Sequence, residues 1–166
     1  ISSYLEESPI KAYPIKQIFF EQFIFFTQWH EVREYANQHG VELFGDIPIF
    51  VARDSADVWA QRDNFLMDEN GEMQFVAGVP PDAFSDTGQR WGNPLYDWGH
   101  MQSGNYKWWK ERFKTQLELF DMIRVDHFRG LESCWQIPGE DTTAINGYWQ
   151  EVPGREMLQT MFDNFE

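Results

Sequence analysis

The chain has 166 residues, a size normal for one domain and sufficient for a substantial core. Its formal net charge of −14 argues against nucleic acid or an anionic membrane as partner, because both attract basic surfaces. Eight Trp and 15 Phe are more than a core of this size needs, so we expect some rings at a surface that stacks on sugars or other flat apolar ligands.

The cysteine content and hydropathy predict a protein of a reducing compartment. Cys134 is the single cysteine, so no internal disulfide can form, and we expect a cytoplasmic location. The most apolar stretch, residues 18–26, is interrupted by Glu21 and Gln22 and is too short to cross a membrane. No signal peptide is visible, although the chain starts at an isoleucine rather than a methionine.

The first third of the chain predicts a loop, a helix and a strand. Residues 1–14 contain Ser and Pro pairs typical of a loop, and residues 16–39 place apolar side chains on two helical stripes that predict burial on more than one side. Gly40 supplies the left-handed stop. Residues 41–50 read as a buried parallel strand ended by a proline, with Asp46 near its carboxyl end.

The middle of the chain predicts a short helix, a hairpin and a long loop. Residues 55–60 begin with a serine N-cap, and residues 65–76 predict a β-hairpin that turns at an Asn-Gly pair. Residues 77–99 combine many Pro and Gly with several aromatic rings. Linkers are poor in aromatics, so this irregular stretch is interpreted as a binding loop.

The last third predicts helix, strand, irregular chain and helix. Residues 103–120 form one apolar stripe, residues 121–126 are a short buried strand, and residues 131–152 look irregular. A final helix opens at a Pro-Gly pair. Four of its side chains are expected to face inward: Met157, Leu158, Met161 and Phe162.

Both predicted strands end in an acidic residue. Asp46 and Asp126 therefore fall where α/β barrels build their active sites. Residues two apart on a strand share a face, so Arg124 lies beside Asp126 and favours its ionised form, as a carboxylate nucleophile of a glycosidase-type reaction requires. A structural Arg–Asp pair that closes a strand explains the same residues equally well.

The element order predicts an α/β fold. We expect part of a (β/α)8 TIM barrel with an inserted β-hairpin and a long aromatic loop. A full barrel takes roughly 250 residues, and only two strands are clear. Residues 1–166 are therefore interpreted as a fragment of a single catalytic barrel domain, with strands near 41–47 and 121–126 and an inserted loop subdomain at about 62–100.

Several long motifs resemble the 4-α-glucanotransferases (amylomaltases, or disproportionating enzymes), a branch of the α-amylase superfamily. The resemblance runs from about Ile18 to the end of the chain. Its motifs occur in the family's order: GDIPIFV (45–51) with DSADVW (54–59), VAGVPPDAFS (76–85) with GQRWGNPLYDW (88–98), RVDHFRG (124–130) and, more weakly, TAING (143–147).

The resemblance implies a role for each matched side chain. Asp126 corresponds to the catalytic nucleophile, which forms a β-linked glucosyl-enzyme intermediate, and Arg124 to the arginine that orients it. Asp46 has a supporting role. The remaining matched residues contact or cover the glucan near the scissile bond: Asp82, Gln89, Trp91 and His127.

The implied reaction transfers α-1,4-glucan segments between maltodextrins by a retaining double displacement, with no cofactor and no catalytic metal. The family's general-acid glutamate and its third carboxylate lie in later motifs that this sequence does not contain. We therefore expect the 166-residue polypeptide to be inactive alone. The resemblance leaves a structural calcium ion possible.

Three other functions remain as alternatives. An α-glucan hydrolase of the same superfamily would keep Asp126 and Arg124 and use water as acceptor. A non-catalytic carbohydrate-binding module would fit the aromatic content but not the αβ pattern. A metal-dependent hydrolase would use Asp46, Asp126 and His127, but none of the four histidines has a metal-binding spacing.

Overall fold

A computed structural model describes residues 9–165, and the chain divides into two compact units. The first combines residues 1–45 with 117–123, and the second combines residues 46–116 with 124–166. The expected loop at 1–14 lies outside the described residues up to residue 8, and from Pro9 onward it is helical. Within the described residues no helix is long and apolar enough to cross a membrane.

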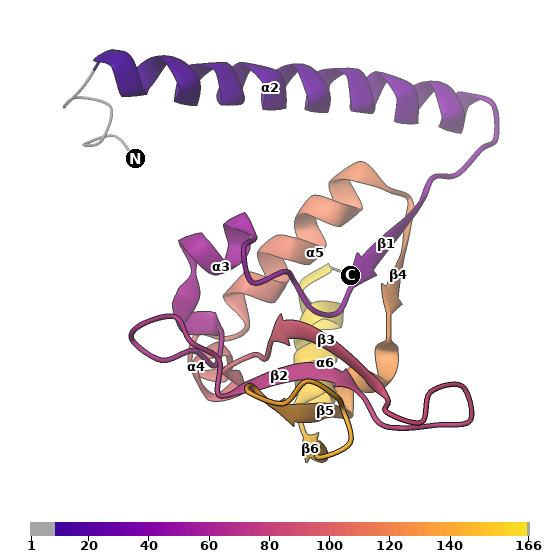
Figure 1. Cartoon of the computed structure of the whole chain (residues 1–166). Helices are drawn as coiled ribbons and strands as arrows, with labels where there is room; N and C mark the ends of the chain where they lie inside the picture. The colour runs from indigo at the N-terminus through magenta and orange to yellow at the C-terminus, as the bar shows by residue number, and fades with distance from the viewer. Residues whose placement is uncertain (1–8, 166) are drawn as a thin grey trace. The chain divides into compact units, whose positions relative to one another are not determined.

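The first unit is dominated by helix α2 (Pro9–Gln38), drawn in indigo and violet in Figure 1. Gly40 follows it with a φ of +72°, as expected for a helix stop. The expected burial of two apolar stripes is wrong, because Phe25 and Val32 of one stripe and Phe19 and Phe23 of the other are exposed. Four half-buried side chains in the second half of α2 form one narrow stripe: Phe26, Trp29, Arg33 and Ala36.

Side chains of α2 complete the end of helix α5 (Lys107–Leu119). The last carbonyls of a helix have no partner within the helix. Trp29 donates its indole N–H to the carbonyl of Leu119 at 2.7 Å. Arg33 donates to the carbonyls of Leu117 at 3.1 Å and Glu118 at 2.7 Å. These bonds give the last carbonyls of α5 hydrogen-bond donors. The positive charge of Arg33 also lies at the negative end of the helix dipole, which is favourable.

Asp121 joins three segments of the first unit. Its carboxylate pairs with Arg33 at 2.8 Å and accepts hydrogen bonds from the side chain of Asn37 at 2.9 Å and the backbone N–H of Leu43 at 2.8 Å. The Leu43 N–H, Asn37 and Arg33 together lower the pKa of Asp121 to about 2. One carboxylate thus fixes α2, the chain before β1 and the chain before β4.

Strands β1 (Phe44–Pro48) and β4 (Met122–Asp126) form a two-stranded sheet, and their arrows run in the same direction in Figure 1. The expectation that both strands are buried is wrong for one face. Gly45 and Ile47 are buried, whereas the alternate positions of both strands are exposed. Other described residues cover one face of this two-stranded sheet, and the side chains of Asp46 and Asp126 lie on the opposite, exposed face.

The second unit contains a four-stranded antiparallel sheet in the order β3-β2-β5-β6. The strands are β2 (Phe75–Val79), β3 (Gln89–Pro94), β5 (Ser133–Pro138) and β6 (Tyr148–Glu151). The regions 77–99 and 131–152, expected to be irregular, therefore contain three strands and part of a fourth. Their partners lie far apart in sequence, and short strands rich in Pro and Gly carry little local signal.

The expected hairpin at 65–76 is also wrong. The Asn-Gly pair does turn, within a loop closed by a hydrogen bond from Asp68 N–H to the carbonyl of Glu72 at 2.9 Å. The Asp68 carboxylate accepts from the N–H groups of Asn70 and Glu72, each at 2.8 Å. The strand after this turn pairs with β3 and β5 rather than with the segment before it.

The helices of the second unit differ from expectation at two places. The helix expected at 103–120 starts later, because α4 (Trp98–Ser103) ends at Ser103 and α5 begins at Lys107, after Asn105 and Tyr106, which both have a φ of 51°. Tyr106 is buried, so tertiary packing outweighs local helix propensity there. In α6 (Gly154–Phe165), Met157 and Met161 are buried as expected, Leu158 is partly buried, and Phe162 is exposed.

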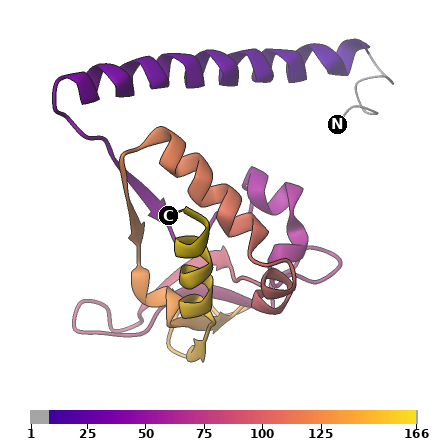
Figure 2. The same cartoon turned by 180° about the vertical axis from the view of Figure 1, so that it is seen from behind.

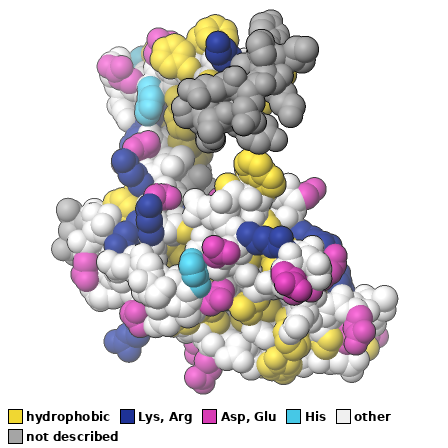
Figure 3. Space-filling view, turned by 90° about the vertical axis from the view of Figure 1, so that its left-hand side faces the viewer, with side chains coloured by type: hydrophobic (Ala, Val, Ile, Leu, Met, Phe, Trp, Pro, Cys, Tyr) yellow, Lys and Arg dark blue, Asp and Glu magenta, His cyan; other side chains and the backbone are white. Residues whose placement is uncertain are grey.

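The core of the second unit is aromatic. Tyr96 contacts five rings, with centroids 5.8 Å away for Phe50 and 5.3–5.5 Å away for the other four, Phe65, Trp98, Trp108 and Trp109. Helix α6 lies in front of the sheet in Figure 2 and behind it in Figure 1. The short helices α3 (Ala56–Ala60), η1 (Arg62–Asn64) and η2 (Phe128–Leu131) complete the unit. Apolar side chains also reach the surface, among charged ones, on the face shown in Figure 3.

Replacing Asp121 by Asn should lower the free energy of unfolding. The folded pKa of Asp121 lies below the ordinary value of 3.8, so its stabilisation is present above pH 3.8 and is lost as pH falls through about 2. Urea unfolding of wild type and D121N should differ near neutral pH and converge at the acidic end of this window. Asp86→Asn, at an exposed position, is the control and should unfold like the wild type at every pH. A loss of stability in D121N that stays the same down to about pH 2 would contradict the stabilising role of the Asp121 carboxylate.

Candidate functional site

The two-stranded sheet brings together three charged side chains on its exposed face. Arg124 on β4 donates from Nε to Asp46 Oδ1 at 3.0 Å and from Nη2 to Asp46 Oδ2 at 2.5 Å, a two-point pair across the strands. The same Nη2 lies 3.7 Å from Asp126 Oδ1. More than half of each of these three side chains is exposed, so the arrangement is open to a ligand.

The pairing differs from the sequence-based expectation in one respect. Arg124 does lie beside Asp126, but both of its hydrogen bonds go to Asp46. Hydrogen bonding from Arg124 lowers the pKa of Asp46, and the Asp46 carboxylate raises the pKa of Arg124. Asp46 thus holds the guanidinium in a fixed plane, while the Asp126 carboxylate stays outside this two-point pair.

His127 follows Asp126 and turns the chain away from the strand. Its backbone is left-handed, with φ 51° and ψ 48°, and its carbonyl accepts from Gly130 N–H at 2.8 Å. The imidazole meets the edge of Trp91 with centroids 4.8 Å apart. Burial lowers the pKa of His127, which favours the neutral ring near pH 7. A non-glycine residue in this conformation carries strain that often marks a functional site.

Trp91 and Gln89 lie on strand β3, and Trp91 contacts His127. The indole N–H of Trp91 donates to Gln89 Oε1 at 3.1 Å, and its ring is tilted against Phe50 with centroids 6.4 Å apart. Both side chains were expected on an irregular loop, but strand β3 holds them instead. Trp91 remains 38% exposed, so part of its ring is available for stacking.

Asp82 stands apart from the other predicted site residues. Its Oδ1 accepts from the N–H groups of Phe84 at 2.8 Å and Ser85 at 2.9 Å, which closes a turn in its own loop. This turn presents Phe84, 97% exposed, at the tip. These bonds fix the turn around Asp82, and its contact with a glucan stays a prediction.

The structure adds a set of supporting residues that sequence reasoning missed. Three side chains donate to backbone carbonyls at the end of β1 and just after it: Arg112 to Pro48 at 2.5 Å, Tyr96 to Ile49 at 2.5 Å, and Asn93 to Val51 at 2.9 Å. These bonds fix the chain that follows Asp46. Their partners are 42 to 64 residues apart in sequence, which local patterns do not reveal.

The acidic and histidine side chains of this site do not form a metal centre. Within residues 9–165, no group of three or more His, Cys, Asp or Glu side chains is placed to hold a metal ion. Asp46 is already engaged by Arg124 through both carboxylate oxygens. The site consists of the Asp126 carboxylate beside Arg124, followed along the chain by the contact between His127 and Trp91.

The chain belongs to the 4-alpha-glucanotransferase family, glycoside hydrolase family 77, whose model matches residues 6–166. A 4-alpha-glucanotransferase of Synechocystis is 53% identical over 86% of this chain, and one of Thermus thermophilus is 47% identical over 88%. The chain spans only 28% and 29% of these two curated relatives.

Two solved structures share the fold of this chain. The amylomaltase of Streptococcus agalactiae, solved in complex with acarbose, is 40% identical with a TM-score of 0.83, over 87% of this chain and 29% of that one. The amylomaltase of Corynebacterium glutamicum, 20% identical with a TM-score of 0.71 over 81% of this chain and 18% of that one, shares the fold.

Replacing Tyr96 by Phe should destabilise the second unit by about 1–3 kcal/mol, because the buried Ile49 carbonyl loses its donor. Urea unfolding followed by tryptophan fluorescence measures the change. Tyr148→Phe is the matched control. The Tyr148 hydroxyl also donates to an acceptor, Gln136 Oε1, but Tyr148 is 44% exposed, so water can reach this hydrogen bond and replace the lost hydroxyl. Equal effects of the two variants would contradict a special role for the Tyr96 bond.

Proposed function

We propose that this chain supplies the nucleophile side of a 4-α-glucanotransferase active site, which transfers α-1,4-glucan segments between maltodextrins. The observation that carries the proposal is the exposed Asp126 carboxylate beside an arginine that Asp46 fixes through two hydrogen bonds. Membership of the family supports the reaction class. The acarbose complex of the S. agalactiae relative supports a glucan-like ligand.

In the proposed mechanism, an oxygen of Asp126 attacks the anomeric carbon of the donor glucan. The bond to the leaving 4-oxygen breaks, and that oxygen takes a proton from a carboxylic acid supplied elsewhere in the whole protein. A 4-hydroxyl of a second glucan then attacks the same carbon, returns its proton to that acid's carboxylate and frees Asp126. Two inversions give net retention of the α configuration.

The remaining residues position the reactants. Arg124 holds the Asp126 carboxylate in one orientation before attack, and Asp46 holds Arg124. His127 and Trp91 form an aromatic wall next to the nucleophile, on which a glucosyl ring can stack while water is displaced. Exclusion of water favours a sugar acceptor, which separates this function from hydrolysis.

We further propose that the chain is part of a larger (β/α)8 catalytic barrel in the cytoplasm, with β1 and β4 as two of its strands. The four-stranded sheet is the inserted subdomain of this barrel. Because β2 pairs with both β3 and β5, this subdomain combines residues 62–100 with residues 133–151. On its strand β3, Trp91 bonds Gln89 and contacts His127, the residue that follows the proposed nucleophile.

In the complete protein, Asp126→Asn should reduce kcat for maltotriose disproportionation by at least about 10⁴-fold, because it removes the nucleophile. Asp46→Asn should cost about 10²-fold, because Arg124 loses its anchor but the nucleophile remains. Asp163→Asn, on the exposed side of α6, is the control. A kcat of D126N within ten-fold of the wild-type value would contradict the proposed function.

The 166-residue polypeptide alone should show no transfer from maltotriose, because its sequence contains one of the two carboxyl groups that the reaction uses. Chromatography of maltotriose incubated with the purified chain checks this. Appearance of glucose together with maltopentaose, at a rate proportional to protein concentration, would contradict the assignment of the general acid to another part of the protein.

A further inference from the structure

Strand β3 carries a bulge at Trp91. Residues 90–94 of β3 advance four positions opposite residues 76–78 of β2, which advance only two. Gly92, in the middle of this bulge, has a φ of +79°, a left-handed conformation that glycine adopts without strain. A bulge beside an active site commonly re-aims a side chain. The direction of the Trp91 ring therefore depends on the contacts that fix the bulge.

One side chain ties the bulge to the chain that follows Asp46. Asn93 donates from Nδ2 to the carbonyl of Val51 at 2.9 Å. Asn93 is half-buried and Val51 is buried, so water replaces this donor poorly, and the carbonyl is costly to leave unpaired. Because Asn93 is two residues from Trp91, the bond fixes the stretch of backbone that carries the indole.

Residues 49–51, which contain this acceptor, also contact Trp91 directly. Phe50 is buried, and its ring centroid lies 6.4 Å from that of Trp91 and 5.8 Å from that of Tyr96. The Tyr96 hydroxyl in turn donates to the carbonyl of residue 49. The segment next to Trp91 is therefore held by the aromatic core independently of Asn93.

The same segment reaches the turn that begins at His127. Gly130 closes this turn by donating its N–H to the carbonyl of His127 at 2.8 Å. A Cβ placed on Gly130 would lie 2.7 Å from Ile49 Cδ1 and 3.2 Å from His127 Cδ2, which is closer than ordinary contact. The glycine thus lets the turn approach Ile49 closely. Residues 49–51 therefore contact both Trp91 and the turn of its partner His127.

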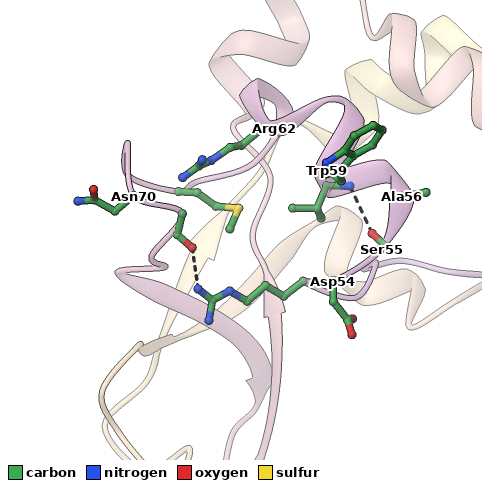
Figure 4. Close-up of a pocket in the computed structure, with 10 residues that line it drawn as sticks. Asp54, Ser55, Ala56, Trp59, Arg62 and Asn70 are labelled. Atoms are coloured by element: carbon green, nitrogen blue, oxygen red, sulfur yellow. Dashed lines mark hydrogen bonds between the residues drawn. The ribbon is translucent and has the colours of Figure 1, made fainter. Parts of the chain in front are cut away.

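The chain beyond this segment is held as well. Arg53 donates from Nη2 to the carbonyl of Gly71 at 2.9 Å. Ser55 caps helix α3 by accepting at 3.3 Å from a backbone N–H in its first turn, the dashed line beside the labelled Ser55 in Figure 4. Because the chain is bonded on both sides, residues 49–51 provide a fixed support for the bulge.

We propose that Asn93 is a positioning residue, which holds the bulge of β3 against residues 49–51 and thereby keeps the Trp91 indole against the His127 imidazole. The proposal rests on the proposed function, in which this aromatic pair displaces water beside Asp126. Without the Asn93 bond the pair opens and water reaches the glycosyl-enzyme intermediate. A water oxygen then bonds the anomeric carbon, the bond to Asp126 breaks, and the water proton passes to the carboxylate that acts as base.

Asn93→Asp in the complete protein tests this role, because the carboxylate has the shape of the amide but no N–H to donate. With maltotriose as substrate, transfer conserves the number of reducing ends, whereas hydrolysis increases it. N93D should raise the ratio of hydrolysis to transfer roughly ten-fold. Asn93→Ala, which removes the donor without adding charge, should act in the same direction. Asn164→Asp, at an exposed position of α6, makes the same charge change and should leave the ratio unchanged.

A double-mutant cycle separates positioning from a general loss of stability. In a Trp91→Ala background there is no indole to hold, so N93D should change the ratio by less than about two-fold. Equal effects of N93D with and without Trp91, or a wild-type ratio in both N93D and N93A, would overturn the proposal.

The outcomes also separate this role from the proposed function. A wild-type ratio in N93D together with lost turnover in D126N overturns the positioning role alone. Turnover that survives in D126N, whatever the effect of N93D, overturns the proposed function, and with it the intermediate that the aromatic pair is proposed to protect.

Discussion

The two-point pair between Arg124 and Asp46 is the interaction on which the proposed site depends. It joins the two strands of a sheet whose exposed face would otherwise carry three mobile charged side chains. Because Asp46 accepts both hydrogen bonds, the Arg124 guanidinium is held in place with one edge toward Asp126. The Asp126 carboxylate lies 3.7 Å from it and takes part in neither hydrogen bond.

The surrounding structure is arranged to keep this pair in place. The chain after Asp46 is held by three side chains that donate to its carbonyls, and Tyr96 among them is also central to the aromatic core. On the far side of Asp126, the left-handed turn at His127 brings an imidazole against Trp91. Packing, strand pairing and site geometry are therefore coupled through the exposed Arg124–Asp46 pair and a few hydrogen bonds to the backbone, of which the Tyr96 bond is buried.

Sequence reasoning located the two strands that end in aspartate and the family motifs, because both signals are local. It assigned Arg124 to Asp126 because they share a strand face, but the partner across the sheet, Asp46, takes both hydrogen bonds. It missed β5, β6 and the break at Tyr106 for a related reason: these features depend on pairing or burial by distant segments. The role of Tyr96 was equally hidden, since its acceptor lies 47 residues away.

The central claim is that Asp126 attacks the sugar, and covalent trapping tests it most directly. A fluorinated glucosyl fluoride slows the second displacement, so the glycosyl-enzyme intermediate accumulates in the complete protein. After digestion, mass spectrometry should find the sugar on the peptide that contains Asp126, and D126N should remain unlabelled. A sugar attached to Asp46 or to any other carboxylate would contradict the account.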